Sequence, residues 1–179
     1  MSLGDLDRRR FLGIGMAAAA GLVVPAVPAM AGAGRALSFR NLHTGERLTA
    51  TYWSGGRYLS DGCRQIDRLL RDHRTGDVAP ISVELLDLLH DLHRRLDAAA
   101  PFEVISGYRS PRTNSRLAAA SSGVARRSLH MRGMAVDVRL PGCSLKRLRT
   151  TARAMKAGGV GFYPRSGFVH LDVGRVRYW

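Results

Sequence analysis

The stretch SLHMRGMAVD, residues 128–137, places His130 seven positions before Asp137. A neutral imidazole and a carboxylate are both ligands that Zn²⁺ accepts in proteins. The overlapping segment MAVDVRL, residues 134–140, alternates in a way that predicts a strand, with Asp137 on the face opposite its two valine neighbours. The stretch therefore supplies two potential metal ligands, one of which a strand holds in place.

A third potential ligand, His170, lies in the tail GFVHLDVG, residues 167–174. This segment also alternates, so that His170 shares one strand face with Phe168 and Asp172. Two imidazoles and one carboxylate can hold Zn²⁺ while leaving a fourth position open for water, which a catalytic zinc site requires. We therefore expect these three distant side chains to converge on one zinc ion.

Residues 107–114, GYRSPRTN, combine a turn with an arginine that follows the strand candidate FEVIS, residues 102–106. An arginine held at such a place can bind a carboxylate or stabilise an oxyanion, because its guanidinium group offers two parallel charge-assisted hydrogen bonds. Arg109 is therefore a candidate for this function. The alternative is that Arg109 is one of many surface arginines and has no such function.

Hydrophobic periodicity predicts strands and helices that follow one another without a regular βαβ alternation. We expect strands at residues 37–42, 48–53, 102–106, 134–140, 160–163 and 168–173. We expect helices from a cap at Ser60 or Asp61 to about His73, from a cap at Ser82 to Leu96, through Leu117 and Ala120, and from a cap at Ser144 past Met155. The predicted fold class is α+β, a small antiparallel sheet flanked by helices.

Two histidines and two cysteines outside the motifs are further candidates for metal binding or for a disulfide. His90 and His93 are three positions apart on a predicted helix but lie off its leucine face, so we expect surface histidines. Cys63 and Cys143 are the only cysteines, and neither has a metal-binding spacing. An oxidising compartment permits a disulfide between them, but we expect two buried or partly buried thiols.

The composition of the chain limits the classes of partner that the protein is expected to bind. The chain has 179 residues, 45% of them hydrophobic, which suits one ordinary core, and a formal net charge of +14. This charge favours anionic partners such as nucleic acid, a lipid surface or an acidic wall polymer, and the alternative is a solvated basic surface. Because the sequence shows no helix-turn-helix pattern, basic amphipathic helix or aromatic-interleaved basic stripe, we expect no nucleic-acid partner.

The amino terminus predicts export. The pattern DRRRFL, residues 7–12, precedes an apolar run from Leu12 to Val27 and the small-x-small tripeptide AMA, residues 29–31. We expect a twin-arginine signal peptide over residues 1–31 and a single mature domain over residues 32–179, in the periplasm or secreted. The run is shorter than the ~20 residues of a membrane span, so we expect no stable anchor after cleavage. An uncleaved anchor is the alternative.

Three motifs in this order resemble one known family. SGYRSPRTN, the pattern S-x-H-x-x-G-x-A-x-D at residues 128–137 and GVGFYPRSGFVHLDVG resemble the zinc D-Ala-D-Ala peptidases. That family includes vancomycin-resistance D,D-peptidases and phage endolysin peptidases, and it shares its fold with the hedgehog signalling domain. The chain resembles most the murein endopeptidase K type. The resemblance covers residues 36–179, with its core motifs in 102–179, and implies a zinc peptidase domain of that fold.

The resemblance also implies functions for individual residues. It makes His130, Asp137 and His170 the zinc ligands, Arg109 the residue that steadies a substrate carbonyl or carboxylate, and Ser128 a contact to the substrate peptide. The vancomycin-resistance enzymes carry a glutamate base three residues before the last histidine, where this chain has Gly167. Asp172 is the available substitute: it can activate the water or orient an imidazole, and we favour the orienting function.

The substrate that the resemblance implies is the stem peptide of peptidoglycan. Cleavage would fall at a cross-link between diaminopimelate residues or between D-Ala and diaminopimelate, by a zinc-activated water. A D,D-carboxypeptidase acting on wall peptides is one alternative. A non-catalytic, zinc-stabilised wall-binding module is another, which the glycine in place of the glutamate base favours.

Overall fold

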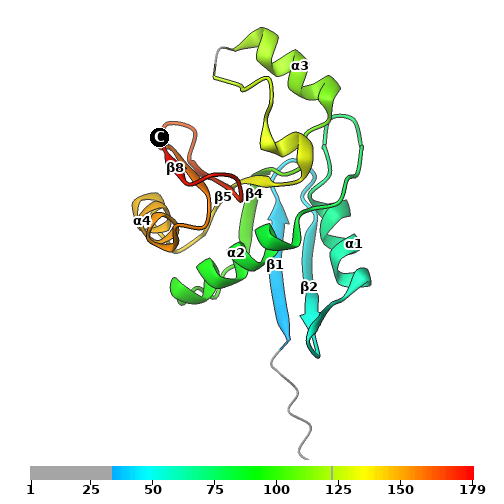
Figure 1. Ribbon diagram of the computed structural model, residues 1–179, viewed down its shortest axis with the longest axis vertical. Coiled ribbons are helices and arrows are strands. Elements are labelled where there is room, and N and C mark those ends of the chain that lie inside the picture. The colour runs from blue at the N-terminus through cyan, green and yellow to red at the C-terminus, as the bar shows by residue number, and fades with distance from the viewer. Residues whose placement is uncertain (1–33, 122) are drawn as a thin grey trace, which may run out of the picture. The chain divides into compact units, whose positions relative to one another are not determined.

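The computed structural model describes residues 34–121 and 123–179 (Figure 1). The predicted signal peptide, residues 1–31, lies outside this part of the chain. Within it, eight strands form one sheet in the order β3-β2-β1-β4-β5-β7-β6-β8. The strands are β1 (Arg35–Asn41), β2 (Arg47–Ser54), β3 (Arg57–Tyr58), β4 (Phe102–Ser106), β5 (Ala135–Arg139), β6 (Gly159–Tyr163), β7 (Phe168–Asp172) and β8 (Arg177–Tyr178).

Four α-helices and one short 3₁₀ helix accompany the sheet in the described residues. They are α1 (Ser60–Leu69), α2 (Val83–Arg95), α3 (Pro111–Ala120), η1 (Leu129–Arg132) and α4 (Leu145–Met155). The predicted α+β class is confirmed. The sheet is larger than expected and mixed, because β1 pairs with β4 and β6 with β8 in parallel. Residue alternation reveals a strand but not its neighbour in the sheet, and β3, β8 and η1 are too short to show a period.

Of the three predicted helix caps, one is confirmed, one is wrong, and one lies at the predicted position without the expected hydrogen bond. Ser144 accepts a hydrogen bond from a backbone amide of the first turn of α4, as predicted, and Ser110 does the same in α3, where no cap was predicted. The N-cap position of α1 is Leu59, so neither Ser60 nor Asp61 caps that helix. Ser82 occupies the N-cap of α2, but its hydroxyl is hydrogen-bonded to the Glu84 carboxylate instead of a backbone amide.

The core lies between the sheet and α1, α2 and α4, and α2 crosses in front of β1 in Figure 1. The predicted leucine stripe of α2 is buried: Leu85, Leu86, Leu89 and Leu92 are 0% exposed. The prediction of surface histidines is wrong, because the flanks of α2 also meet aromatic side chains. The His93 ring packs edge-on against Phe102, and the partly buried His90 ring meets Tyr52 in the same way.

Two further expectations concern the cysteines and the membrane. Cys63 and Cys143 are both free and partly buried, as predicted. Among the described residues, no helix combines the length and the apolar character needed to cross a membrane.

Candidate metal centre

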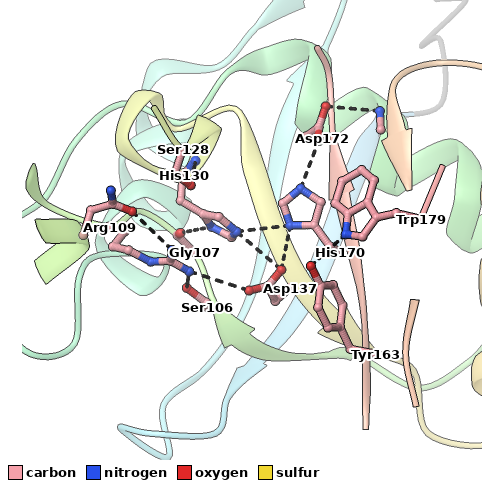
Figure 2. A network of polar contacts seen from close by, with 12 residues as sticks. Ser106, Gly107, Arg109, Ser128, His130, Asp137, Tyr163, His170, Asp172 and Trp179 are labelled. Carbon is pink, nitrogen blue, oxygen red and sulfur yellow. Dashed lines mark hydrogen bonds and ion pairs between the residues drawn. The ribbon is translucent and has the colours of Figure 1, made fainter. Parts of the chain in front are cut away.

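His130, Asp137 and His170 come together at the middle of the sheet (Figure 2). The Nδ1 atom of His170 lies 2.8 Å from Oδ1 of Asp137. The Nε2 atom of His130 lies 3.2 Å from that imidazole nitrogen and 3.4 Å from the same carboxylate oxygen. The predicted convergence of three potential ligand atoms is therefore present in the fold.

Strand pairing explains one half of this cluster. β5 and β7 are antiparallel neighbours, and their register places Asp137 directly opposite His170. Residues opposite each other in an antiparallel pair project from the same face of the sheet. Alternation sets the strand face on which Asp137 and His170 each lie, and the pairing register then brings the two side chains into contact.

A tight turn supplies the third ligand. His130 lies in η1, which begins after Ser128 and is followed by Gly133, where φ is +64°. A Cβ atom at Gly133 would lie 2.1 Å from the carbonyl oxygen of Pro80, so no other residue fits without a backbone shift. The glycine in the S-x-H-x-x-G pattern therefore lets η1 turn sharply enough to aim His130 at the strand pair.

The hydrogen bonds of the two imidazoles fix which nitrogen faces the cluster. Nδ1 of His130 donates to the carbonyl oxygen of Gly107 at 2.7 Å, and Nε2 of His170 donates to Oδ2 of Asp172 at 3.0 Å. Each ring therefore turns an unprotonated nitrogen towards Asp137. Three lone pairs converge with no donor among them, and a cation is the group that makes such an arrangement favourable. The donor set of two nitrogens and one oxygen fits a metal ion of the zinc type.

The local electrostatics point the same way. Burial raises the pKa of Asp137, but the imidazoles of His130 and His170 outweigh it and hold the pKa below its usual range. Burial lowers the pKa of His170, but without a metal ion the carboxylates of Asp137 and Asp172 stabilise its protonated form more strongly and raise the pKa. The site therefore attracts positive charge, and a bound metal ion would displace the proton that otherwise satisfies this attraction.

Asp172 is 0% exposed, and both of its carboxylate oxygens are hydrogen-bonded. They accept from the backbone amides of Gly159 and Gly174, from both terminal nitrogens of Arg177 and from His170. Burial raises the pKa of Asp172, but the bonds from His170 and Arg177 outweigh it and lower the pKa. A carboxylate so enclosed is well placed to orient the imidazole of His170.

Arg109 and Ser128 border the same cluster from the side of η1. The terminal nitrogens of Arg109 donate to Asn114 and Ser106 at 3.4 Å each, and one lies 3.9 Å from Oδ2 of Asp137. Its buried Nε has no partner among the described residues. These long contacts leave the guanidinium group with donors for a ligand. The Ser128 hydroxyl accepts from the amide of His130 at 3.4 Å.

A cleft of about 490 Å³ opens above the three ligands. Its lining includes both predicted substrate contacts, Arg109 and Ser128, and four residues that sequence reasoning did not single out. These are Arg127, Tyr163, Arg177 and Trp179. Tyr163 had a local signal, since it ends a strand in the last motif. Trp179 and Arg177 had none, because they reach the cleft through the parallel pairing of β8 with β6.

The chain has named relatives over nearly its whole length. The chain is similar to proteins named peptidoglycan L,D-endopeptidase MepK from Escherichia coli K12, 40% identical over 179 residues, and from Shigella flexneri at the same identity, with 98% of both chains covered. It is 36% identical over 183 residues to the probable peptidoglycan L,D-endopeptidase MepK of Haemophilus influenzae, covering 100% of this chain and 98% of that protein.

No solved structure matches the chain. The model of one protein family, described as peptidoglycan L,D-endopeptidase MepK, matches residues 29–179. This match and the identity to the relatives confirm the resemblance that the three motifs predicted, including its murein endopeptidase K branch. The chain belongs to the peptidoglycan L,D-endopeptidase MepK family.

Proposed function

We propose that the protein is a zinc-dependent peptidoglycan endopeptidase that hydrolyses stem-peptide cross-links of the cell wall. The observation that carries this proposal is the convergence of His130, Asp137 and His170, whose lone pairs meet at one point beneath an open cleft. The family supports the reaction class, since its described members are endopeptidases acting on peptidoglycan.

Some residues of the site would bind the metal ion, and others would contact the substrate. A bound zinc ion supplies a water that ionises near neutral pH and a Lewis acid for the scissile carbonyl. His130, Asp137 and His170 hold the ion, and Asp172 keeps the imidazole of His170 in its ligating tautomer. Arg109 donates hydrogen bonds to the carbonyl or carboxylate of the substrate, and Ser128 contacts the peptide.

The name of the relatives favours one of the two cross-links that the sequence leaves open. A bond between two diaminopimelate residues joins an L centre to a D centre, whereas the bond from D-Ala to diaminopimelate joins two D centres. The L,D-endopeptidase relatives therefore support the first. Arg109 and Arg127 both line the cleft, and their charges suit the free carboxylate that such a cross-link carries next to the scissile amide.

The substrate also supports export. Peptidoglycan lies outside the cytoplasm, so we propose that residues 1–31 are a twin-arginine signal peptide and that residues 32–179 form the mature, unanchored domain in the periplasm or medium. The family match begins at residue 29, next to this boundary. Sequencing the amino terminus of the exported protein tests the boundary, and a start elsewhere than near Gly32 would contradict it.

One observation favours a second candidate, a zinc-stabilised module that binds the wall without cutting it. Gly167 replaces the glutamate base of related enzymes. It lies in a turn at φ +73°, and a Cβ atom at this position would have no other atom within 4 Å. Among the described residues that line the cleft, Asp137 is the only carboxylate. A binding module needs no base, and a carboxypeptidase would need one as much as an endopeptidase does.

Digestion of isolated sacculi separates these candidates. We expect the zinc-loaded protein to remove dimers cross-linked between diaminopimelate residues, detected by mass spectrometry of the muropeptides. His130→Ala should lose this activity, and His43→Ala, which changes an exposed histidine outside the cleft, should retain it. Release of D-Ala alone would indicate a carboxypeptidase. Zinc-dependent sedimentation with sacculi and no new muropeptides would indicate a binding module.

A further inference from the structure

Tyr163 occupies the cleft but has no part in the mechanism described so far. It is the last residue of β6, pairs with Phe168 of β7 across the hairpin and stacks on that ring at 4.7 Å between centroids. It lines the same cleft as the three ligands and Arg109. Figure 2 shows its hydroxyl end turned towards Asp137 and His170. The side chain is thus held by a ring neighbour and presents a polar atom to the reaction centre.

The hydroxyl of Tyr163 is oriented by a second aromatic residue. Nε1 of Trp179 donates a hydrogen bond to the Tyr163 oxygen at 2.7 Å. An indole can only donate, whereas a phenol both donates and accepts. Because the phenolic oxygen is already an acceptor here, its own proton is the group left for a ligand in the cleft.

The position of Trp179 is itself well determined. Its backbone amide donates to Val160, and its carbonyl oxygen accepts from Phe162. A Cβ atom at Gly161 would lie 2.6 Å from the indole ring, so the ring rests on bare backbone at the residue that pairs with His170. The indole also lies 5.3 Å from the imidazole of His170. Trp179 is 46% exposed, yet these contacts fix it against the metal centre.

We propose that Tyr163 is a catalytic residue that donates a hydrogen bond to the scissile carbonyl oxygen as negative charge develops on it, and that Trp179 is its positioning residue. This proposal rests on the endopeptidase function. Tyr163 keeps its proton throughout, so its contribution is electrostatic and complements that of Arg109 across the cleft. It suits a cleft whose only described carboxylate is a metal ligand, because the stabilisation of charge then falls to donors.

Tyr163→Phe tests the catalytic part. We expect kcat to fall by about 10²- to 10³-fold, as when an oxyanion donor is removed elsewhere, with KM, zinc content and melting temperature close to those of the wild type. The matched control is Tyr178→Phe, whose hydroxyl donates to the Arg153 carbonyl outside the cleft. This control should leave kcat unchanged.

Trp179→Phe tests the positioning part, because it keeps a ring and removes the indole N–H. We expect a smaller loss of kcat than for Tyr163→Phe, and a double variant no slower than Tyr163→Phe alone, since both changes act through one hydroxyl. Binding of a phosphinate analogue of the scissile amide gives a readout besides turnover. Both variants should weaken binding of the analogue more than they raise KM for the substrate.

The possible outcomes distinguish the assignment of Tyr163 and Trp179 from the endopeptidase function on which it rests. Wild-type kcat in Tyr163→Phe, or a loss of zinc or of melting temperature that accounts for its slower turnover, would overturn the assignment of Tyr163. Strictly multiplicative losses in the double variant would overturn the assignment of Trp179. A wild-type protein that cuts no muropeptide would instead overturn the endopeptidase function, whatever the variants do.

Discussion

The two halves of the metal centre are held in different ways. Asp137 and His170 lie on neighbouring strands, so the hydrogen-bonded ladder between β5 and β7 sets their spacing. His130 and Arg109 lie on η1 and on the turn after β4, where no ladder continues. We call these the strand half and the loop half of the site.

The loop half depends on ties to a segment far away in the sequence. Asp72 accepts hydrogen bonds from the amide and the hydroxyl of Ser110, at 3.0 and 2.7 Å, next to Arg109. The amide of Tyr108 donates to the carbonyl oxygen of Leu70, and a Cβ at Gly107 would lie 2.4 Å from that oxygen. A mutation in residues 70–72 should therefore disturb Arg109 and leave the strand half in place.

The largest effect is expected from the centre of the strand half. Asp137→Asn removes the negative charge among the three ligands and keeps the shape of the side chain, so zinc content and muropeptide release should both fall to background. Asp77→Asn, an exposed change outside the cleft, is the matched control. Full zinc content in Asp137→Asn, measured by elemental analysis, would contradict the assignment of Asp137 as a ligand.

Next in size is the partner that orients His170. Asp172→Asn keeps the shape but weakens the acceptor of the imidazole N–H and leaves Arg177 without its carboxylate. We expect zinc affinity and turnover to fall together by about 10- to 100-fold. Competition with a chelator measures the affinity. If turnover were abolished while zinc affinity stayed at the wild-type value, Asp172 would be the base instead.

The difference between the halves also explains what the sequence could predict. Alternation around Asp137 and His170 is local and identifies both the strand and the face, so the strand half could be predicted from residues alone. His130 was a candidate by its residue type, and the resemblance gave its function as a ligand, but no pattern predicted the 3₁₀ turn that holds it. Asp72, Tyr163 and Trp179 could not be singled out, because their contacts depend on which distant segments become neighbours in the sheet.

The helix α1 shows the same limit. Periodicity predicted that it continues to His73, but it ends at Leu69. The next residues make other bonds: Leu70 accepts from Tyr108, and Asp72 turns the chain by accepting from Thr75 and Gly76 through its carbonyl oxygen. Tertiary contacts that support Arg109 thus override local helix propensity.

A mutation in the loop half should lower the free energy of unfolding and leave the zinc content unchanged. Asp72 is 1% exposed, and Asp72→Asn weakens two of its bonds to Ser110. We expect about 1–3 kcal/mol less free energy of unfolding in urea, a several-fold rise in KM as Arg109 shifts, and unchanged zinc content at saturating zinc. A loss of zinc equal to that of Asp172→Asn would contradict the independence of the two halves.

Acid should erase this difference in stability. Burial raises the pKa of Asp72, but hydrogen bonds from Thr113 and Ser110 outweigh it and hold the folded-state pKa below the unfolded value, which is about 3.9. The carboxylate therefore stabilises the fold above the unfolded pKa, and this contribution is lost as the pH falls through the folded pKa. The stabilities of the wild type and Asp72→Asn should stay apart at pH 7 and begin to approach each other only as the pH falls below ~4.

The smallest effect concerns Ser128, which caps η1 and lines the cleft. Ser128→Ala removes a long hydrogen bond of 3.4 Å to the amide of His130, so the loss of stability should be about 0.5–1 kcal/mol. Ser144→Ala is the matched control, because that hydroxyl accepts a comparable bond of 3.2 Å at the start of α4, outside the cleft. If Ser128 also contacts the substrate, only Ser128→Ala raises KM. Equal KM values in the two variants would reduce Ser128 to a helix cap and leave Arg109 as the loop half's contact with the peptide.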